Sequence, residues 1–585
     1  MTSSAYLSFK VHLHELFQQA AQAITPPDTS FRIELTRTKQ SSHGDYSCNL
    51  AMQLAKPLHK NPREVAQALI AALPPSPYVE KIEIAGAGFI NLFLKNAAKQ
   101  AYLHHVLQGR ESYGHGQSGQ GKKIQVEFVS ANPTGPLHVG HGRGAAYGAS
   151  LANILSAAGF NVSREFYVND AGRQMDILTL STWLRYLELN HTAIPFPKNA
   201  YQGDYVKSMA QLIQQAHAQR YVHHPDSLFS DLPDSTREIA IDTDEQLDRL
   251  IANAKKILGE DYAYIHNLVL TEQLGDCRND LMEFGVEFDV WFSEQSLYDN
   301  GLVAHAMQLL EQKHYLYQQD GATWFRSTDF GDEKDRVVQR ENGQYTYFAS
   351  DIAYHLNKFD RGFDQVINIW GADHHGYIPR VKGALQALDL DPAKLEIALV
   401  QFAVLYRDGK KAPMSTRSGE FVTLRELREE VGKDAARFFY VMRKSDQHLD
   451  FDLDLAKSQS NENPVYYLQY AHARVCSVLT QWGGDPADLM QSDTDLLSNP
   501  DELALLQKLI DYPDIVEASA KEFSPHLIAF YLRELASEFH SYYNSTRFLV
   551  DDIPLQHARL ALIASIKQVL NNGLMLLGVN APDQM

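Results

Sequence analysis

The spacing of hydrophobic and polar residues changes along the chain, and each change predicts a different kind of structure. Residues 1–115 begin with a helical pattern that ends near Ile24 and finish with two strand-like runs, VEKIEIA and GFINLFL, so we expect a small α+β domain. From about Asp454 onward the period is that of α-helices throughout. Residues 454–585 are therefore predicted to form an all-α helical bundle.

Between these ends, runs typical of β-strands alternate with helical runs, as they do in a parallel α/β sheet. The strand-like runs are IQVEFV, NVSREFYV, DQVINIW and LEIALVQFAVL. A long polar insertion at about 189–244 interrupts the alternation, and the glycine-rich stretch 114–123 is typical of a linker. We predict an α/β domain over residues 116–405 and a connecting segment over 406–453.

One predicted strand–turn–helix unit carries candidate chemistry. The alternating run 124–129 is broken by asparagine, proline and glycine, and a helix rich in alanine and leucine is predicted from about Gly142. A helix N-terminus presents unpaired N–H groups to phosphates, and Gly140 and Gly142 carry no side chain that would block a nucleotide. His138 and His141 are three residues apart, so both can donate hydrogen bonds to charge that develops at an α-phosphate.

Three other interpretations use the same residues. GHGRGA, at 140–145, also fits the G-x-G-x-x-A pattern of dinucleotide-binding folds, with Glu165 about twenty residues further on, which would indicate an oxidoreductase. The H-x-x-H spacing could instead supply two metal ligands of a hydrolase, together with His374 and His375. A buried histidine pair with a purely structural role is the third interpretation.

Seven segments, taken in order, give the chain a resemblance that covers nearly all of it. They are ANPTGPLHVGHGRGAAYG, NDAGRQ, FDVWFSE, YFASDIAYH, WGADHHGYIPR, PMSTRSG and NPVYYLQYAHAR. In this order they resemble the arginyl-tRNA synthetase family. HVGH is similar to the first signature of class I synthetases, PMSTRSG to a degenerate form of the second, and the last segment to the start of the family's anticodon-binding domain.

The resemblance implies a class I Rossmann-like catalytic domain and an arginine–tRNA ligase of protein biosynthesis. Arginine's carboxylate would attack the α-phosphorus of ATP, held as its Mg²⁺ complex, and the arginyl group would pass to the terminal adenosine of tRNA(Arg). Positioning and charge stabilisation suffice for this chemistry, so no tightly bound protein metal is expected. The family also implies a monomer and activation that depends on bound tRNA. The degenerate second signature leaves a non-enzymatic tRNA-binding paralogue open.

Arginine recognition can be argued from chemistry, because a planar guanidinium requires a carboxylate in a dry site. Tyr347 and Asp351 are four residues apart and would share a helix face. The resemblance assigns both to the guanidinium and assigns Glu127 and Asn132 to further arginine contacts. A first-turn acid that only stabilises its helix is the structural alternative for Asp351.

The segment WGADHHG follows an apolar run and lies at the expected carboxyl edge of a parallel strand, where ligands bind. The resemblance assigns Gly371 and Asp373 to adenosine. Of the two histidines that follow, His374 is favoured over His375 as a contact to ATP.

The second signature departs from the common KMSK pattern. Pro413 and Thr416 stand where two lysines would neutralise phosphate charge, and Gly135 stands where some family members carry a compensating lysine. The remaining candidates for holding ATP or stabilising its phosphates are Met414, Ser415, Arg417, Lys410 and Lys411. We predict that Arg417→Ala lowers the activation rate by more than about tenfold, as expected for the loss of one charge-stabilising donor.

Four residues are candidates for binding tRNA. The resemblance places Phe89 and Asn91 in a domain that approaches the tRNA corner where the D-loop lies, and an aromatic ring with an amide suits stacking on and hydrogen bonding to a base. Tyr466 and Tyr470 share a helical stripe in the segment similar to the anticodon-binding domain. Burial in the core is the structural alternative for Phe89 and for the tyrosine stripe.

Composition restricts the partners and the compartment. The formal net charge of −19 argues against indiscriminate binding to polyanions, so RNA contacts are expected from local basic side chains. The candidates are Lys410, Lys411, Arg417, Arg425 and Arg428. The three cysteines are far apart, and neither an export signal nor an apolar run long enough to span a membrane is recognisable, so a cytoplasmic protein without membrane contact is expected.

Overall fold

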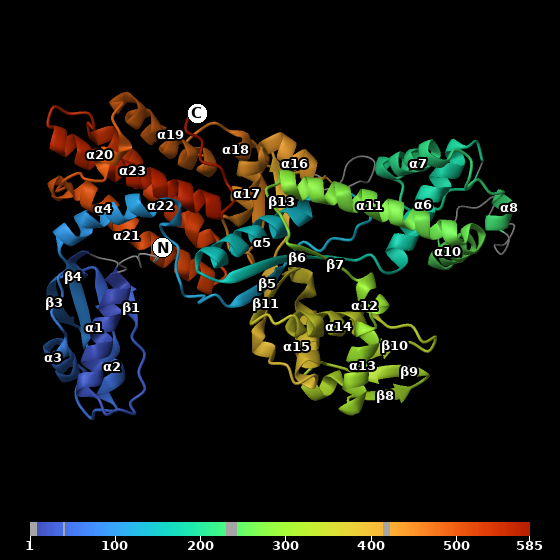
Figure 1. Cartoon of the computed structure of the whole chain (residues 1–585), viewed down its shortest axis with the longest axis horizontal. Helices are drawn as coiled ribbons and strands as arrows, with labels where there is room; N and C mark the ends of the chain where they lie inside the picture. Colours follow the sequence, from blue (N-terminus) through green and yellow to red (C-terminus); the bar gives the residue numbers. More distant parts are fainter. Residues whose placement is uncertain (1–8, 39–40, 193, 230–242, 413–421) are drawn as a thin grey trace.

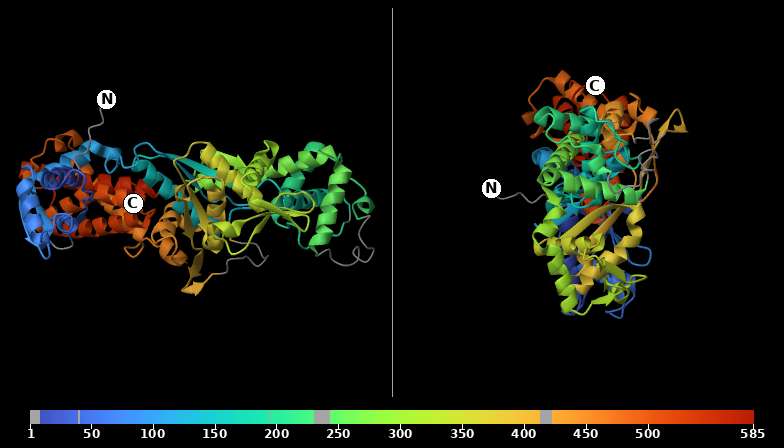
Figure 2. Two further views of the ribbon diagram at one scale, coloured as in Figure 1. Left: turned by 90° about the horizontal axis from the view of Figure 1, so that it is seen from below. Right: turned by 90° about the vertical axis from the view of Figure 1, so that its right-hand side faces the viewer.

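The computed structural model describes residues 9–38, 41–192, 194–229, 243–412 and 422–585. The molecule is elongated, with a parallel sheet near its middle (Figure 1). The N-terminal sheet domain and the C-terminal helices lie at one end, and a helical insertion lies at the other, as the second orientation also shows (Figure 2). In the part of the chain that the structure describes, no helix is both long enough and apolar enough to cross a membrane.

The central sheet has five strands in the order β12–β11–β5–β6–β7, and every neighbouring pair is parallel. The strands are β5 (Lys123–Glu127), β6 (Asn161–Val168), β7 (Val290–Ser293), β11 (Gln365–Gly371) and β12 (Leu395–Val400). The predicted α/β class is confirmed. The register aligns Glu127 with Asn368 on one side and with Glu165 on the other, so three polar residues form a row across the buried sheet.

Helices and a small second sheet flank the central sheet (Figure 1). The helices are α5 (Val139–Ala157), α12 (Gln295–Asp299), α13 (Leu302–Gln312), α14 (Tyr347–Asp360) and α15 (Ile378–Ala387). The small sheet is antiparallel, with the order β10–β9–β8, and is formed by β8 (Leu316–Gln319), β9 (Ala322–Phe325) and β10 (Arg336–Gln339). Leu310, Phe325 and Ala349 belong to one buried cluster that joins this sheet to α13 and α14.

The insertion is larger and more ordered than its polar sequence indicates. It comprises α6 (Arg173–Leu189), α7 (Asp204–His217), α8 (Pro225–Leu228), α10 (Asp244–Leu258) and α11 (Glu260–Glu283). These helices enclose a hydrophobic core of their own, which includes Trp183, Ile213 and Leu250. The helices α7 and α10 are amphipathic, so their polar outer faces dominate the composition while one apolar face of each packs inward.

The run LEIALVQFAVL is not one strand. It divides into β12 and β13 (Ala403–Arg407), and β13 pairs in a different sheet with β14 (Lys410–Lys411) and β15 (Leu449–Asp452). Gln401 lies at the break, where its N–H donates to Ser445 O at 2.9 Å and its carbonyl accepts from Arg143 at 2.8 Å. The connecting segment also contains α16 (Leu424–Val431), α17 (Lys433–Val441) and α18 (Leu453–Lys457).

The C-terminal region is helical, as predicted. Its helices are α19 (Pro464–Trp482), α20 (Pro486–Leu489), α21 (Pro500–Lys521), α22 (His526–Ser545) and α23 (Ile553–Leu576). The helix α4 (Asn96–Gly109), which the sequence grouped with the N-terminal domain, packs against α21 and α23. Gln100 of α4 donates to Leu497 O at 2.7 Å.

The N-terminal domain contains a four-stranded antiparallel sheet in the order β1–β2–β4–β3, covered by helices. Its elements are α1 (Phe9–Ile24), β1 (Leu35–Arg37), β2 (Tyr46–Cys48), α2 (Leu50–Ala55), α3 (Pro62–Ala72), β3 (Val79–Ala85) and β4 (Phe89–Leu94). The glycine-rich stretch 114–123 connects this end of the molecule to β5. This stretch is held against the end of α5 by hydrogen bonds. The N–H groups of Gly116 and Gly119 donate to carbonyls there at 2.7 and 2.9 Å.

Candidate active site

The first signature lies at the N-terminus of α5. The helix begins at Val139, three residues earlier than predicted, because His138 acts as its N-cap. His138 Nδ1 accepts a hydrogen bond from the N–H of Gly140 at 3.1 Å, and His141 Nδ1 accepts one from the N–H of His138 at 3.2 Å. A histidine cap was not anticipated, since serine, threonine, aspartate and asparagine are the usual residues at this position.

The two imidazole rings stack with their centroids 3.7 Å apart. Burial lowers the pKa of His138, and burial together with the neighbouring His138 lowers the pKa of His141 to about 3. Both rings are therefore neutral near pH 7. Because each Nδ1 accepts a hydrogen bond, each ring carries its proton on Nε2, and the pair is preorganised as two N–H donors.

The chain that follows the second signature pairs with the first. Leu424 N–H donates to Leu137 O at 2.7 Å, Val139 N–H donates to Val422 O at 3.0 Å, and His138 and Thr423 form an isolated antiparallel bridge. This places the C-terminal flank of PMSTRSG beside HVGH although the two segments are far apart in sequence. Met414, Ser415 and Arg417 themselves lie outside the described residues.

Two glycines at this helix terminus have packing roles. A side chain at Gly140 would meet the ring of His138 at 2.8 Å, so glycine lets the histidine cap fold back. A side chain at Gly142 would meet Tyr440 at 2.8 Å and Leu424 at 2.9 Å. Close contact of α5 with α16 and α17 therefore requires glycine at 142 independently of any nucleotide contact there.

A pocket rich in carboxylates lies beside α14. Asp351 is partly buried and accepts a hydrogen bond from the hydroxyl of Tyr377, and Ser350 Oγ donates to Glu294 Oε1 at 3.3 Å. Burial and the charge of Glu127 raise the pKa of Asp351 to about 6, and burial and Asp351 raise the pKa of Glu294 to about 7. Within the described ranges neither carboxylate forms an ion pair, so the pocket is suited to a cationic ligand.

The predicted arginine contacts divide into exposed and paired groups. Tyr347 is 63% exposed at the start of α14, and Asn132 is also exposed. Glu127 is different, because the fully buried Lys358 Nζ pairs with its Oε2 at 2.5 Å and Ser130 Oγ donates to its Oε1 at 3.0 Å. The structure therefore places Glu127 under the pocket in a satisfied ion pair, which the sequence did not indicate.

A strained bend connects this ion pair to the site. Val129 and Ser130 follow β5 with φ values of 68° and 43°, a left-handed conformation that is unusual for a β-branched residue. Ser130 Oγ accepts from the N–H of Tyr167 at 3.1 Å, and Ser130 O accepts from Asn169 Nδ2 at 3.1 Å. These bonds to β6 and the loop after it hold the bend that directs the chain from β5 toward HVGH.

The segment WGADHHG ends β11 at the carboxyl edge of the sheet, as predicted. Asp373 and His374 have side chains about 60% exposed, with Oδ2 and Nε2 3.6 Å apart, and His375 is exposed as well. A side chain at Gly371 would lie 2.4 Å from Asp373 Oδ1. A cavity of about 630 Å³ adjoins these residues and is also lined by Tyr377 and Arg380.

Of the predicted tRNA contacts, Phe89, Tyr466 and Tyr470 reach the surface, whereas Asn91 is only 6% exposed. Phe89 is 41% exposed at the start of β4, and together with Asn91 it lines a hollow of about 440 Å³, so the alternative of a core phenylalanine is wrong. Tyr466 and Tyr470 are partly exposed on α19 and stack with centroids 5.9 Å apart. The Arg474 guanidinium lies 4.4 Å from the Tyr470 ring, which extends an aromatic and basic stripe along α19.

The basic side chains predicted to contact RNA divide into exposed residues and residues held in ion pairs. Lys410 and Lys411 are exposed in β14. Arg425 pairs with Asp276 at 2.6 Å and with Asp280 at 2.8 Å, and Arg428 pairs with Glu283. These two arginines fasten α16 to α11, so the expectation that they are available to RNA is not supported.

Three residues of the site were missed. Glu294 is part of the quoted motif FDVWFSE and Tyr377 part of WGADHHGYIPR, but nothing local in the sequence shows that both face Asp351. Phe402 is 49% exposed and would touch a side chain at Gly140 at 3.5 Å. Phe402 lies inside the run LEIALVQFAVL, whose apparent continuity as one strand gave no sign of the break between β12 and β13 that exposes the ring.

Two alternative interpretations conflict with this geometry. Glu165 is buried and pairs with Arg361 at 2.6 Å and with the Tyr354 hydroxyl, so it is not placed to bind a ribose as a dinucleotide fold requires. In the part of the chain that the structure describes, the one cluster of His, Cys and acidic ligand atoms close enough to share an ion contains none of His138, His141, His374 and His375.

Comparisons with known proteins cover the whole chain. Residues 11–94 match the model of the arginyl tRNA synthetase N terminal domain, 102–452 that of the tRNA synthetases class I (R) catalytic domain, and 468–585 that of the DALR anticodon binding domain. Among curated relatives, an arginine–tRNA ligase of Nitrosospira multiformis is 72% identical and one of Nitrosomonas europaea 68% identical. These matches cover 99% and 100% of both chains, respectively.

A solved arginyl-tRNA synthetase of Thermus thermophilus has a similar fold, with a TM-score of 0.74 at 24% identity over 98% of this chain and 100% of that one. The catalytic-domain match spans both the histidine pair and the carboxylate pocket described above. By these matches, the chain belongs to the arginyl-tRNA synthetase family, the class I arginine–tRNA ligases.

Proposed function

We propose that the carboxylate pocket of this arginine–tRNA ligase selects L-arginine by its charge. Asp351 and Glu294 would bind the guanidinium, with Tyr347 covering it and Tyr377 fixing Asp351. The observation that carries this proposal is two neighbouring carboxylates whose pKa values are raised to about 6 and 7 and which have no ion-pair partner in the described ranges. Ionising two buried carboxylates costs free energy, and a bound cation offsets that cost. An uncharged analogue leaves both carboxylates unpaired.

Glu127 takes a different part in the same proposal. Its ion pair with Lys358 fixes its position below the pocket, and its negative charge still contributes to the field at Asp351. We assign to it and to the exposed Asn132 the contacts to the backbone end of arginine, near the N-terminus of α5.

ATP would bind between α5 and the end of β11. His138 and His141, neutral and protonated on Nε2, would donate hydrogen bonds to the phosphates as charge develops at the α-phosphorus. Gly140, Gly142, Gly371, Asp373 and His374 are assigned to the nucleotide, and the exposed ring of Phe402 offers it an apolar surface. Met414, Ser415 and Arg417 keep their assignment to ATP, supported by the pairing of their C-terminal flank with HVGH.

Glycine stands at 135, where some family members carry a lysine before the first signature, and Tyr205 lies beside this position. A side chain at Gly135 would lie 3.2 Å from the hydroxyl of Tyr205, which donates to Thr134 O at 2.7 Å. Tyr205 of the insertion therefore occupies the space beside this position. Compensation for the altered second signature is assigned to Arg417, with Lys410 and Lys411 as the nearest described cations.

For tRNA(Arg) we propose two contact surfaces, the hollow around Phe89 and Asn91 and the stripe formed by Tyr466, Tyr470 and Arg474. Aromatic rings beside basic groups suit unpaired bases. The corresponding domains would be 1–115, 116–405, 406–453 and 454–585. We also propose a cytoplasmic monomer that uses ATP as its Mg²⁺ complex, and the three free, buried cysteines agree with a reducing compartment.

The test is ATP/pyrophosphate exchange with each amino acid, with and without tRNA(Arg). We expect exchange with arginine only, and only when tRNA is added. Exchange with other amino acids would contradict the selection by charge. A folded protein that binds tRNA(Arg) but gives no exchange would instead support the non-enzymatic paralogue and identify the altered second signature as its cause.

A further inference from the structure

A cluster of three potential metal ligands lies outside the active site, where the C-terminal tail crosses α19. His472 and Cys476 are four residues apart on this helix and are buried, and Asp583 of the tail lies against them. Cys476 Sγ is 3.1 Å from Asp583 Oδ1 and 3.7 Å from His472 Nδ1, and the latter two atoms are 4.0 Å apart. These three atoms belong to the three ligand types that zinc prefers.

The spacing of the three atoms resembles one face of a tetrahedral site. Zinc bonds of roughly 2.0–2.3 Å to nitrogen, oxygen and sulfur place neighbouring ligand atoms about 3.3–3.6 Å apart. The observed separations lie on both sides of that range, so side-chain movements of a few tenths of an ångström would complete it. We propose that His472, Cys476 and Asp583 bind a zinc-class divalent cation, with a water molecule in the fourth position.

Proton balance determines how the cation would enter. His472 Nδ1 lies 3.0 Å from the carbonyl oxygen of Pro582, an acceptor, so Nδ1 carries the proton of the neutral ring. On cation binding that proton leaves Nδ1 and one from solvent binds Nε2, while the Cys476 thiol loses its proton to solvent. One proton is therefore released for each cation bound.

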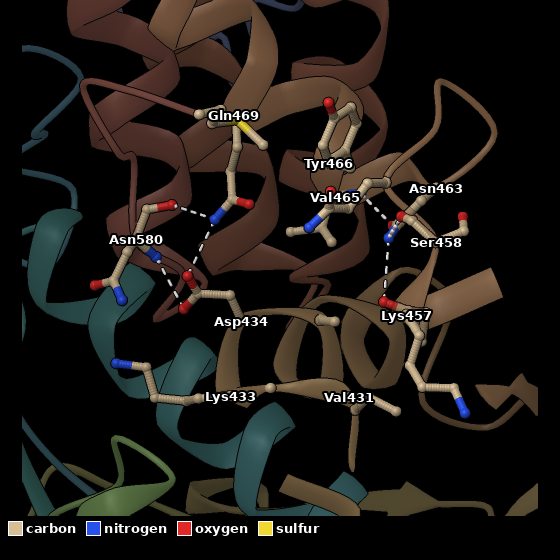
Figure 3. A pocket seen from close by; sticks show the side chains of 15 residues that line it. Val431, Lys433, Asp434, Lys457, Ser458, Asn463, Val465, Tyr466, Gln469 and Asn580 are labelled. Atoms are coloured by element: carbon tan, nitrogen blue, oxygen red, sulfur yellow. Dashed lines mark hydrogen bonds between the residues drawn. The ribbon is translucent and has the colours of Figure 1, made fainter. Parts of the chain in front are cut away.

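The site joins two parts of the molecule through the tail. Three residues before Asp583, the Asn580 N–H donates to Asp434 of α17 at 3.2 Å, and Gln469 of α19 donates to both Asp434 and the carbonyl of Asn580 at 3.0 and 2.9 Å (Figure 3). A cation at Asp583 would fix the end of this connection to α19. Gln469 and Asn580 of this connection line one pocket together with Tyr466 of the proposed tRNA surface.

The positive charge of Lys567 should repel a cation at this site, so a substitution that removes the charge should strengthen cation binding. Its Nζ pairs with Asp583 Oδ1 at 3.5 Å, and both side chains reach solvent. Removal of this positive charge by Lys567→Gln should strengthen cation binding by about fivefold, since a unit charge at this range in water changes an equilibrium by about that factor. Asp583→Asn should weaken it by more than tenfold and cannot disturb the core, because Asp583 is exposed.

The experiment is titration of the full-length protein with Co²⁺, observed through thiolate-to-cobalt charge-transfer absorption. We expect one equivalent of cobalt per chain, displacement by Zn²⁺, and release of one proton in weak buffer. Cys476→Ser should abolish the absorption, whereas Cys277→Ser, a change at a buried cysteine of α11, should retain it. Absorption that survives Cys476→Ser, or no absorption in the folded protein, would overturn the proposal and leave the cluster as a hydrogen-bonded anchor of the tail.

Discussion

The carboxylate pocket and the histidine pair show opposite responses to the same physical cause. Burial raises the pKa of Asp351 to about 6 and of Glu294 to about 7, and it lowers the pKa of His141 to about 3. Burial disfavours charge of either sign. In the pocket, burial leaves carboxyl groups that ionise when a cationic substrate binds. At the helix terminus, burial leaves neutral imidazoles whose N–H groups can donate to the charge that develops in the transition state.

This difference has a consequence for catalysis. Arginine makes the same contacts with the pocket before and during the reaction, so the pocket should affect mainly the arginine requirement. The N–H donors of the histidine pair face charge that grows at the α-phosphorus, so they should affect mainly the rate of activation. Substitutions at the two sites test that division.

His141→Ala should reduce kcat of arginine activation by about 10²–10³-fold and change KM for arginine little, because one preorganised donor to developing charge is lost. Pyrophosphate exchange at saturating tRNA measures both constants. His305→Ala, at an exposed histidine of α13, is the control and should behave as the unaltered protein. An unchanged kcat with a raised KM for ATP would show that His141 acts in ground-state binding, and the division would fail.

Asp351→Asn should raise KM for arginine by about 100-fold and leave kcat within a few-fold, since one charge-assisted contact is worth up to about 3 kcal/mol. The asparagine keeps an acceptor for the Tyr377 hydroxyl, so the fold should persist. Asp360→Asn, at an exposed acid of the same helix, is the matched control. If Asp351→Asn unfolds the protein while arginine affinity is retained, Asp351 is a structural acid of α14 and the pocket is misassigned.

The pH dependence of KM for arginine sharpens the comparison. Arginine requires ionised carboxylates, so its KM should fall by roughly 20-fold between pH 6 and pH 8, as the remaining half of Asp351 and then Glu294 ionise. For stability the sign is opposite. Because folding raises both pKa values from their ordinary values near 4, the empty pocket loses stability as pH rises from about 4 to about 7, and bound arginine offsets that loss.

Glu294→Gln separates the two carboxylates. It should remove the part of the pH dependence near pH 7 and leave the part near pH 6, since only Asp351 then titrates in the pocket. Thermal unfolding of the same variant should show less loss of stability between about pH 4.5 and pH 7 than the unaltered protein. A KM profile that is flat from pH 6 to pH 8 in the unaltered protein would mean that the carboxylates are already ionised without arginine.

The sequence predicted the elements and motifs of the two sites, but it did not predict the partners of the site residues. Periodicity predicted the parallel sheet and the helical C-terminus, because both depend on local patterns of burial. The positions of His138, His141, Asp351 and Asp373 followed from motifs. Their partners did not, because Lys358 under Glu127 and Tyr377 on Asp351 depend on contacts between elements distant in the chain.

The insertion illustrates the same limit. Its helices α7 and α10 are polar over most of their surfaces, so the sequence identified only a long polar insertion and none of its helices. The buried faces become recognisable only when α6 supplies Trp183 and Leu180 as the opposing surface. The break between β12 and β13 was missed for a related reason, since Gln401 is held by Ser445 and Arg143, which are distant in sequence.

The smallest expected effect distinguishes the two roles of His138. Its Nδ1 caps α5, and its Nε2 is the proposed donor to ATP. His138→Ala should lower the free energy of unfolding by about 1 kcal/mol, the usual value of an N-cap, and should also reduce the activation rate. His138→Asn should restore the cap, because asparagine is a preferred N-cap residue, but its amide is too short to replace Nε2.

Chemical denaturation and pyrophosphate exchange on the two variants provide the test. Equal stability of His138→Asn and the unaltered protein, with activation as slow as in His138→Ala, would show that capping and catalysis are separable functions of one ring. If His138→Asn regains both stability and rate, the cap alone is what activation requires at this position. His138 would then act only by capping α5, and His141 would be the single donor to the phosphates. The histidine site would use one neutral donor, whereas the arginine pocket uses two carboxylates.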